Sequence, residues 1–177
     1  MAGAKASMSL SNNSDRLGNI LLAQLCAENQ MIKTRLEKQM PNIELNSISG
    51  ETINVSSHFN EKDKLYVFSF WATWCAPCIN ELEAIHKKYA TWKESLNVEI
   101  IAVSIDDSKT QKRVKPFLNG KGWSYQVLLD SNQELNRALS IVNVPYTFVL
   151  KNNKLVYVSN GYSQGSEEEL YQKLKEL

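Results

Sequence analysis

The sequence has few cysteines, few histidines and no long apolar segment, and each of these shortages argues against one class of protein. Three cysteines in 177 residues are too few for a disulfide-rich secreted scaffold, and two histidines offer little to a metal centre. No apolar run approaches the ~20 residues that a membrane-spanning helix needs. The net charge of +1 comes without a basic stripe, so nothing favours binding to nucleic acid or to a membrane surface. A hydrophobic content of 43% is enough for a core that needs no disulfide staples.

Two of the cysteines, Cys75 and Cys78, are separated by two residues where an apolar run gives way to a helical pattern. The apolar run, Leu65–Trp71, predicts a buried strand. Unpaired N–H groups and the dipole at a helix N-terminus favour a thiolate, which is the nucleophile of disulfide exchange. The spacing therefore predicts a dithiol redox site, in which Cys75 attacks at the junction and Cys78, one turn into the helix, resolves.

Two other interpretations of the cysteine pair stay open, namely half of a zinc site and a structural disulfide. A tetrahedral zinc site needs about four ligands. The remaining candidate ligands are Cys26, His58 and His86, and none stands at ligand spacing. We therefore expect no metal.

Strand-like and helix-like segments alternate through the chain, which predicts an α/β sandwich. A helix is expected over 15–38 and a β-hairpin around Ser49–Gly50, and Asp106–Ser108 is expected to cap a helix over Lys109–Asn119. Further strands are expected at Leu65–Phe70, Val98–Ile105, Val127–Leu129, Tyr146–Leu150 and Leu155–Val158. We divide the chain into residues 1–40, a flexible start with an N-terminal helical extension, and a domain over residues 41–177.

The segment Trp74–Cys78, preceded by Phe70–Thr73 and joined to Val144–Thr147 far downstream, resembles the thioredoxin superfamily. Its nearest branch is that of the TlpA/ResA-like exported thiol–disulfide oxidoreductases, and the resemblance covers residues 41–177. It implies a thioredoxin-like three-layer α/β/α sandwich with an added N-terminal β-hairpin. It also implies a disulfide-containing protein substrate, an upstream thiol reductant, no cofactor, and a periplasmic or cell-envelope location. No signal segment is recognisable at the start of the chain, so we expect a mature or trimmed protein.

The same resemblance assigns further site residues. The proline that matches Pro145 is cis in thioredoxin-like proteins and lies against the dithiol, and the residue before it, here Val144, pairs with an extended substrate through its backbone. Trp74 could belong to the core, but because it directly precedes Cys75 we expect it to form an apolar wall beside the sulfurs. We expect Ala76 and Pro77 to contact the substrate as well.

Two positions depart from the family pattern. Thioredoxins carry a buried aspartate six residues before the first cysteine, where this chain has Ser69. ResA-like proteins can have a glutamate between the cysteines, where this chain has Ala76 and Pro77. We therefore expect the usual carboxylate proton acceptor to be missing at both positions. Water, or a glutamate such as Glu81 or Glu83 reaching over from the helix, would then have to accept the proton, although we expect both glutamates to be surface charges.

The main interpretation is a thiol–disulfide oxidoreductase that reduces disulfides of partner proteins. The first alternative is a peroxiredoxin-like peroxidase, which is disfavoured because Thr73 lies two residues before Cys75 rather than three. The second alternative is a non-enzymatic partner-docking domain with an idle dithiol.

Overall fold

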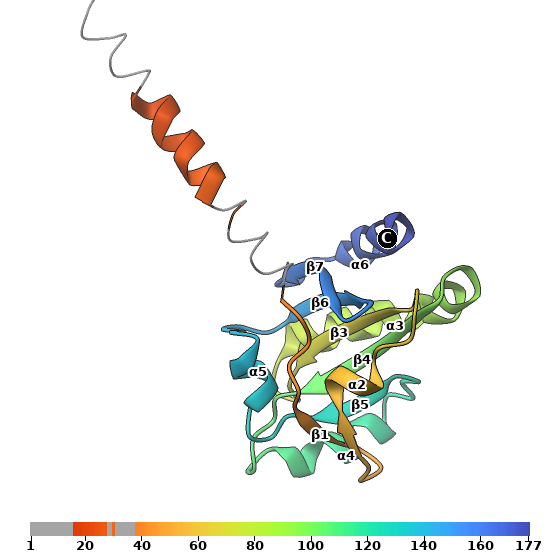
Figure 1. The fold of residues 1–177 in the computed structure, drawn as a ribbon. Helices are drawn as coiled ribbons and strands as arrows, with labels where there is room; N and C mark the ends of the chain where they lie inside the picture. Colours follow the sequence, from red (N-terminus) through yellow and green to blue (C-terminus); the bar gives the residue numbers. More distant parts are fainter. Residues whose placement is uncertain (1–15, 28–29, 31–37) are drawn as a thin grey trace, which may run out of the picture. The chain divides into compact units, whose positions relative to one another are not determined.

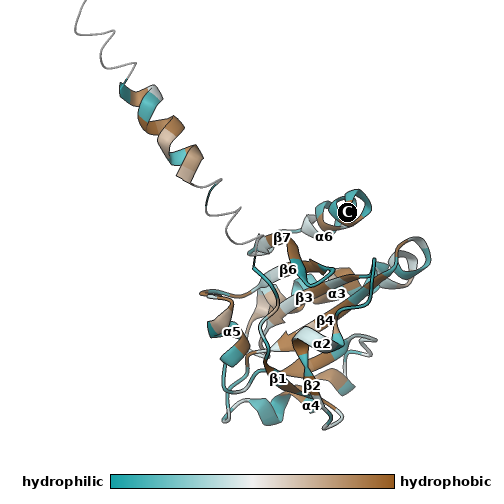
Figure 2. Ribbon diagram, viewed as in Figure 1, coloured by the Kyte–Doolittle hydropathy of each residue, from teal (hydrophilic) through white to brown (hydrophobic). Residues whose placement is uncertain are grey.

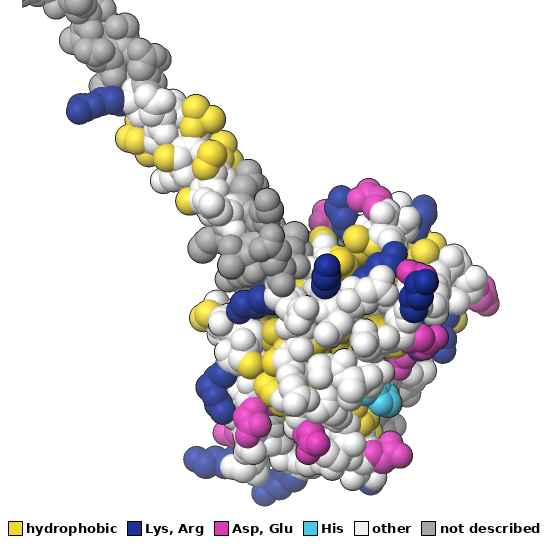
Figure 3. Space-filling view, viewed as in Figure 1, with side chains coloured by type: hydrophobic (Ala, Val, Ile, Leu, Met, Phe, Trp, Pro, Cys, Tyr) yellow, Lys and Arg dark blue, Asp and Glu magenta, His cyan; other side chains and the backbone are white. Residues whose placement is uncertain are grey.

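The computed structural model describes residues 16–27, 30 and 38–177, which fall into two units, 1–37 and 38–177. In the first unit, residues 16–27 form a helix that carries several exposed apolar side chains, coloured yellow in Figure 3. The expected start of this helix and most of its second half lie outside the described residues. Among the residues described, no helix is both long and apolar enough to cross a membrane.

One mixed sheet organises residues 38–177 (Figure 1), and its strand order is β2-β1-β5-β4-β3-β6-β7. Strand β4 pairs in parallel with β3 and β5, and all other neighbours are antiparallel. The strands are β1 (Glu44–Ser47), β2 (Thr52–Asn54), β3 (Leu65–Trp71), β4 (Val98–Ser104), β5 (Gln126–Leu129), β6 (Tyr146–Lys151) and β7 (Lys154–Asn160). The predicted N-terminal hairpin is confirmed as β1–β2, with Gly50 in its turn at a φ of 94° that favours glycine.

Helices cover both faces of this sheet. They are α2 (Val55–His58), α3 (Ala76–Ser95), the 3₁₀ helix η1 (Gln111–Arg113), α4 (Val114–Asn119), α5 (Glu134–Ala138) and α6 (Ser166–Glu176). Successive side chains of a strand point to opposite faces. Phe68 of β3 packs edge-on against Phe59, just after α2, whereas its neighbour Ser69 contacts α3. The predicted α/β/α sandwich is therefore confirmed.

Strand β3 lies in the middle of the core, and all seven of its residues are buried. Figure 2 shows hydrophobic colour concentrated on the central strands and hydrophilic colour on much of the helices. Helix α3 buries Leu82, Ile85 and Trp92 at helical spacing, and Trp92 stacks on Tyr171 of α6 with 5.4 Å between ring centroids. Burying one such side chain contributes about 1.5–3 kcal/mol, so this packing holds α3 firmly over the sheet.

The topology gathers three loops at one edge of the sheet. Parallel strands β3 and β4 both end there, and antiparallel β6 begins there, with Phe70 opposite Tyr146. The chain after β3 runs directly to Cys75, and the chain before β6 contains Pro145. The two sequence-distant motifs are therefore brought to the same edge.

Candidate active site

A tight turn joins β3 to α3 and places the first cysteine. The backbone N–H of Cys75 donates to the carbonyl oxygen of Ala72 over 3.0 Å, which closes the turn. Cys75 is the N-cap of α3, and its Sγ accepts a hydrogen bond from the backbone N–H of Cys78 over 3.4 Å. Pro77 lies between them in the first helical turn, where its missing N–H costs little. The sulfur of Cys75 thus occupies the position where a helix N-terminus stabilises negative charge.

Cys75 and Cys78 are joined by a disulfide, with 5.3 Å between their Cα atoms. Cys75 keeps 5% exposure, whereas Cys78 has none. The third cysteine, Cys26, is a free thiol on the N-terminal helix. In the described part of the chain, no group of three or more His, Cys, Asp or Glu side chains could hold a metal ion. Of the two bonded cysteines, only Cys75 therefore keeps any exposed surface.

Glu81 corrects the expectation of a missing carboxylate. We expected a surface charge, but Glu81 is only 5% exposed and lies one helical turn after Cys78 on α3. Its Oε2 accepts from Ser69 Oγ over 3.1 Å, and its Oε1 accepts from Thr147 Oγ1 over 2.9 Å. Ser69 and Thr147 face each other in the β3–β6 register, so two strands present a hydroxyl pair to one carboxyl group. A buried carboxyl group is therefore present beside Ser69, and it comes from α3 rather than from β3.

Burial dominates the electrostatics of Glu81. Removal from water raises the pKa of its carboxyl group from 4.5 to about 7, and the hydroxyl hydrogen bonds from Thr147 and Ser69 oppose that rise. A group with this pKa is half protonated near neutral pH, so it can both accept and return a proton there.

The loop before β6 carries the second motif. The Val144–Pro145 peptide bond is cis, Pro145 is buried, and its carbonyl oxygen accepts from the N–H of Gly161 after β7 over 2.8 Å. Trp74 is 60% exposed and Val142 is 86% exposed, which makes them unusual among the large apolar residues of the described domain. Trp74 directly precedes Cys75, and Val142 lies three residues before Pro145, so each motif carries an exposed apolar side chain close to it in the sequence.

The expected substrate contacts differ in accessibility. Trp74, Ala76 and Pro77 are exposed, Val144 is half-buried and Pro145 is buried. The first three lie around the start of α3, and the last two lie on the loop that leads into β6.

Sequence reasoning missed the role of Asp106. The segment Asp106–Ser108 was expected to cap the following helix, but it leads into a turn, in which Asp107 accepts from the backbone N–H groups of Lys109 and Thr110. The 3₁₀ helix η1 begins only after this turn, and its N-cap makes no side-chain hydrogen bond. The Asp106 carboxylate turns inward and accepts from the backbone N–H and the hydroxyl of Thr73. No sequence signal identified this contact, because it depends on the β3–β4 register.

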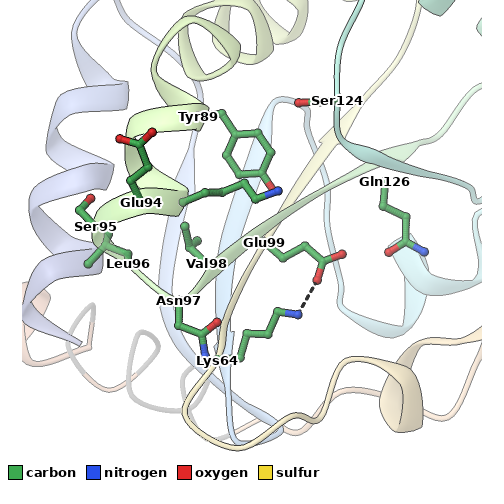
Figure 4. Close-up of a pocket in the computed structure, with 11 residues that line it drawn as sticks. Lys64, Tyr89, Glu94, Ser95, Leu96, Asn97, Val98, Glu99, Ser124 and Gln126 are labelled. Carbon is green, nitrogen blue, oxygen red and sulfur yellow. Dashed lines mark ion pairs between the residues drawn. The ribbon is translucent and has the colours of Figure 1, made fainter.

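A hollow of about 700 Å³ (Figure 4) lies at the edge of the sheet opposite to the one that carries the dithiol. Its lining comes from the C-terminal end of α3 and from residues near the start of β3 and β4, including Lys64, Tyr89 and Glu99. The charge of Lys64 is already paired with Glu99 at 2.9 Å and with Glu61 at 3.2 Å. This hollow is polar and lies away from the dithiol, so its size does not make it the active site.

Comparison with known proteins agrees with this geometry. The AhpC/TSA family model matches residues 36–159. The thiol-disulfide oxidoreductase ResA of Bacillus thuringiensis (strain Al Hakam) is 31% identical over 125 residues, which cover 70% of this chain and 69% of that protein. ResA of Bacillus subtilis (strain 168) is 33% identical over 122 residues, which cover 68% of this chain and 65% of the relative.

Solved structures give the same result. The solution structure of an uncharacterized thioredoxin-like protein from Porphyromonas gingivalis has a TM-score of 0.69 and 41% identity, covering 80% of this chain and 92% of that one. StoA from Bacillus subtilis has a TM-score of 0.60 and 24% identity, covering 75% and 98%, and supports the fold alone. The chain therefore belongs to the AhpC/TSA family and is a thioredoxin-like thiol–disulfide oxidoreductase.

Proposed function

We propose that this protein reduces disulfides of partner proteins through a cycle of Cys75 and Cys78, with Glu81 as the proton acceptor for Cys78. The observation that carries the proposal is the buried Glu81 carboxyl group, one helical turn after Cys78 and hydrogen-bonded to Ser69 and Thr147. A structural disulfide has no need of a group that exchanges protons near neutral pH.

The first step is attack by the Cys75 thiolate on one sulfur of the partner disulfide. A new S–S bond forms between Cys75 and the partner, the partner's own S–S bond breaks, and the released partner sulfur takes up a proton. The N-terminus of α3 stabilises the Cys75 thiolate before attack, since Cys75 is the N-cap and accepts from the N–H of Cys78.

The second step is resolution by Cys78. Its thiol is fully buried, which raises the cost of forming a thiolate, so a base has to take the proton. Glu81 accepts that proton, the Cys78 sulfur attacks Cys75, and the second partner sulfur leaves as a thiolate. Two electrons have then passed to the partner, and an upstream thiol reductant restores the Cys75–Cys78 dithiol.

Substrate binding is assigned to the surface around Cys75. Trp74, Ala76 and Pro77 offer an apolar, exposed surface at the start of α3. Val144 and Pro145 offer backbone on the neighbouring loop, where an extended segment of a partner can pair. These contacts favour a protein or peptide disulfide over a small polar disulfide compound.

The family resemblance supports an exported location for this activity, facing the periplasm or cell envelope. Cell fractionation of the native host, with an antibody against the domain, tests this placement. Recovery from the cytoplasmic fraction alone would contradict it.

The peroxidase alternative is disfavoured by Thr73. Its hydroxyl donates to Asp106 Oδ1 over 2.6 Å, so it is held by a carboxylate in the neighbouring loop. Peroxide consumption in the presence of a thiol reductant separates the two activities, and we expect insulin reduction to be much faster than peroxide consumption.

Trapping tests the assigned roles. Cys78→Ser protein should accumulate a covalent adduct with a disulfide-containing substrate through Cys75, because the resolving thiol is gone. Cys75→Ser is the matched control and should accumulate none. Adducts through Cys78 in the Cys75→Ser protein, or no insulin reduction by the wild type, would overturn the proposal.

A further inference from the structure

Asp106 is a buried carboxyl group at the end of β4 whose hydrogen bonds go to the loop that carries the dithiol. It is 1% exposed and forms no ion pair with any residue in the described ranges. Its Oδ2 accepts from the Thr73 backbone N–H over 2.8 Å and from Ser104 Oγ over 2.9 Å, and its Oδ1 accepts from Thr73 Oγ1 over 2.6 Å. Burying a carboxylate without a cation is unfavourable, so these three donors must offset that cost.

The contact continues the sheet beyond its last strand pair. Trp71 and Ser104 are the final partners of the parallel β3–β4 ladder, and the N–H of Ile105 donates to the carbonyl oxygen of Trp71 over 2.9 Å. Two residues further on, the Asp106 carboxylate accepts the Thr73 N–H. A side chain thus holds the backbone where the ladder has ended.

Thr73 and Trp74 are the two central residues of the turn that the bond from Cys75 N–H to Ala72 oxygen closes. Fixing Thr73 at both its N–H and its hydroxyl fixes the orientation of this turn. The orientation of this turn then determines the direction of the exposed Trp74 ring and the position of Cys75 as the N-cap of α3.

We propose that Asp106 is a positioning residue for disulfide exchange, which holds the Thr73–Trp74 turn so that Cys75 and the Trp74 surface meet the partner disulfide together. The proposal rests on the disulfide-reducing function proposed above. In-line attack on a disulfide tolerates little misplacement, and an error of about 1 Å can cost up to 100-fold in rate.

Asp130 provides a matched control in the same fold. It is also 1% exposed, it follows the neighbouring strand β5, and it accepts backbone hydrogen bonds from Leu135 at 3.2 Å and Asn136 at 2.8 Å. These bonds hold the start of α5 rather than the dithiol turn. Asp106→Asn and Asp130→Asn therefore remove the same charge at the same burial, but only the first loosens the turn before Cys75.

The experiment compares reduced wild type, Asp106→Asn, Asp130→Asn, Thr73→Val and Thr73→Ser. Stopped-flow mixing with a model peptide disulfide measures the rate of attack at a pH where Cys75 is fully thiolate, and urea unfolding measures stability. This pH must be high, because loss of the negative charge of Asp106 can by itself change the fraction of Cys75 that is a thiolate. Alkylation by iodoacetamide reports the intrinsic reactivity of Cys75 without a disulfide partner.

We expect Asp106→Asn to slow attack on the peptide disulfide about tenfold, and Thr73→Val to slow it a few-fold. Thr73→Ser keeps the hydroxyl and should react like wild type. Asp130→Asn should lose stability but keep the wild-type rate. If Asp106→Asn does not fold, the comparison of Thr73→Val with Thr73→Ser decides.

Equal or faster attack by folded Asp106→Asn, or equal rates for Thr73→Val and Thr73→Ser, would overturn the positioning role. A wild type that is alkylated rapidly but fails to reduce insulin would instead count against the proposed function. The two failures are therefore distinguishable.

Discussion

Charged side chains have different surroundings at the two edges of the central sheet. At the dithiol edge, Glu81 and Asp106 are buried, and their partners are hydroxyl and backbone N–H groups rather than cations. At the opposite edge, Lys64 is partly exposed and paired with two glutamates, Glu61 and Glu99. Figure 3 shows charges of both signs interspersed on the face in view. Burying a carboxyl group without a cation is costly, so Glu81 and Asp106 depend on the hydroxyl and N–H donors around them, whereas exposed ion pairs contribute little to stability.

The largest expected effect is on the pH dependence of stability. The pKa of Glu81 rises from 4.5 to about 7 on folding, so the folded state binds the proton more tightly. The resulting stabilisation is fully present below pH 4.5 and is lost as pH rises through 7, a change of roughly 3 kcal/mol. Urea unfolding of the oxidised protein measures this change, because the disulfide-bonded cysteines do not titrate.

Glu81→Gln is the control for that measurement. It keeps the shape of the side chain and removes the titrating group, so the decline in stability between pH 4.5 and 8 should flatten. A variant whose decline matches that of wild type would show that other groups cause the pH dependence.

The next effect concerns Ser69, the position at which thioredoxins carry an aspartate. Ser69 Oγ lies 3.1 Å from Glu81 Oε2, so Ser69→Asp would place a second carboxyl group against the first. Like charges at this separation disfavour double ionisation, and we expect a loss of about 1–3 kcal/mol in the free energy of unfolding at pH 8.

Ser69→Ala separates repulsion from loss of the hydroxyl, and should cost about 1 kcal/mol. The Ser69→Asp loss should shrink at pH 5, where both carboxyl groups can hold protons. A Ser69→Asp protein as stable as wild type at pH 8 would mean that the Glu81 carboxyl group has room to move away.

The smallest effect is expected at the opposite edge. Lys64→Met breaks the ion pairs with Glu61 and Glu99, which are 63% and 31% exposed, so stability should change by less than about 1 kcal/mol. Insulin reduction should stay at the wild-type rate. A clear loss of activity would show that the hollow beside Lys64 takes part in function.

The sequence predicted the features that local patterns encode. The apolar run through β3, the helical pattern that follows it, and the spacing of Cys75 and Cys78 predicted a buried strand, the helix after it and the dithiol. Each of these signals lies within a few turns or one strand, where periodicity alone is informative.

The sequence did not predict the burial and the partners of Glu81 and Asp106. Glu81 lies three residues after Cys78 and four before Ile85, so a helical projection puts it on the buried face, but an ionisable group is usually exposed. Its burial depends on the hydroxyls of Ser69 and Thr147, which come together only through the β3–β6 register. Asp106 meets Thr73 through the β3–β4 register, and sequence spacing does not give that register either.

The most direct test of Glu81 as the proton acceptor is the pH dependence of resolution by Cys78. A mixed disulfide between Cys75 and a peptide can be formed with Cys78 protonated at low pH, and a pH jump then starts release of the peptide. In wild type, the release rate should rise with ionisation of Glu81, with an apparent pKa near 7. In Glu81→Gln this rise should disappear, and release at pH 7 should slow by about 100-fold. Equal rates and equal pH profiles in the two proteins would contradict the role of Glu81 as the proton acceptor.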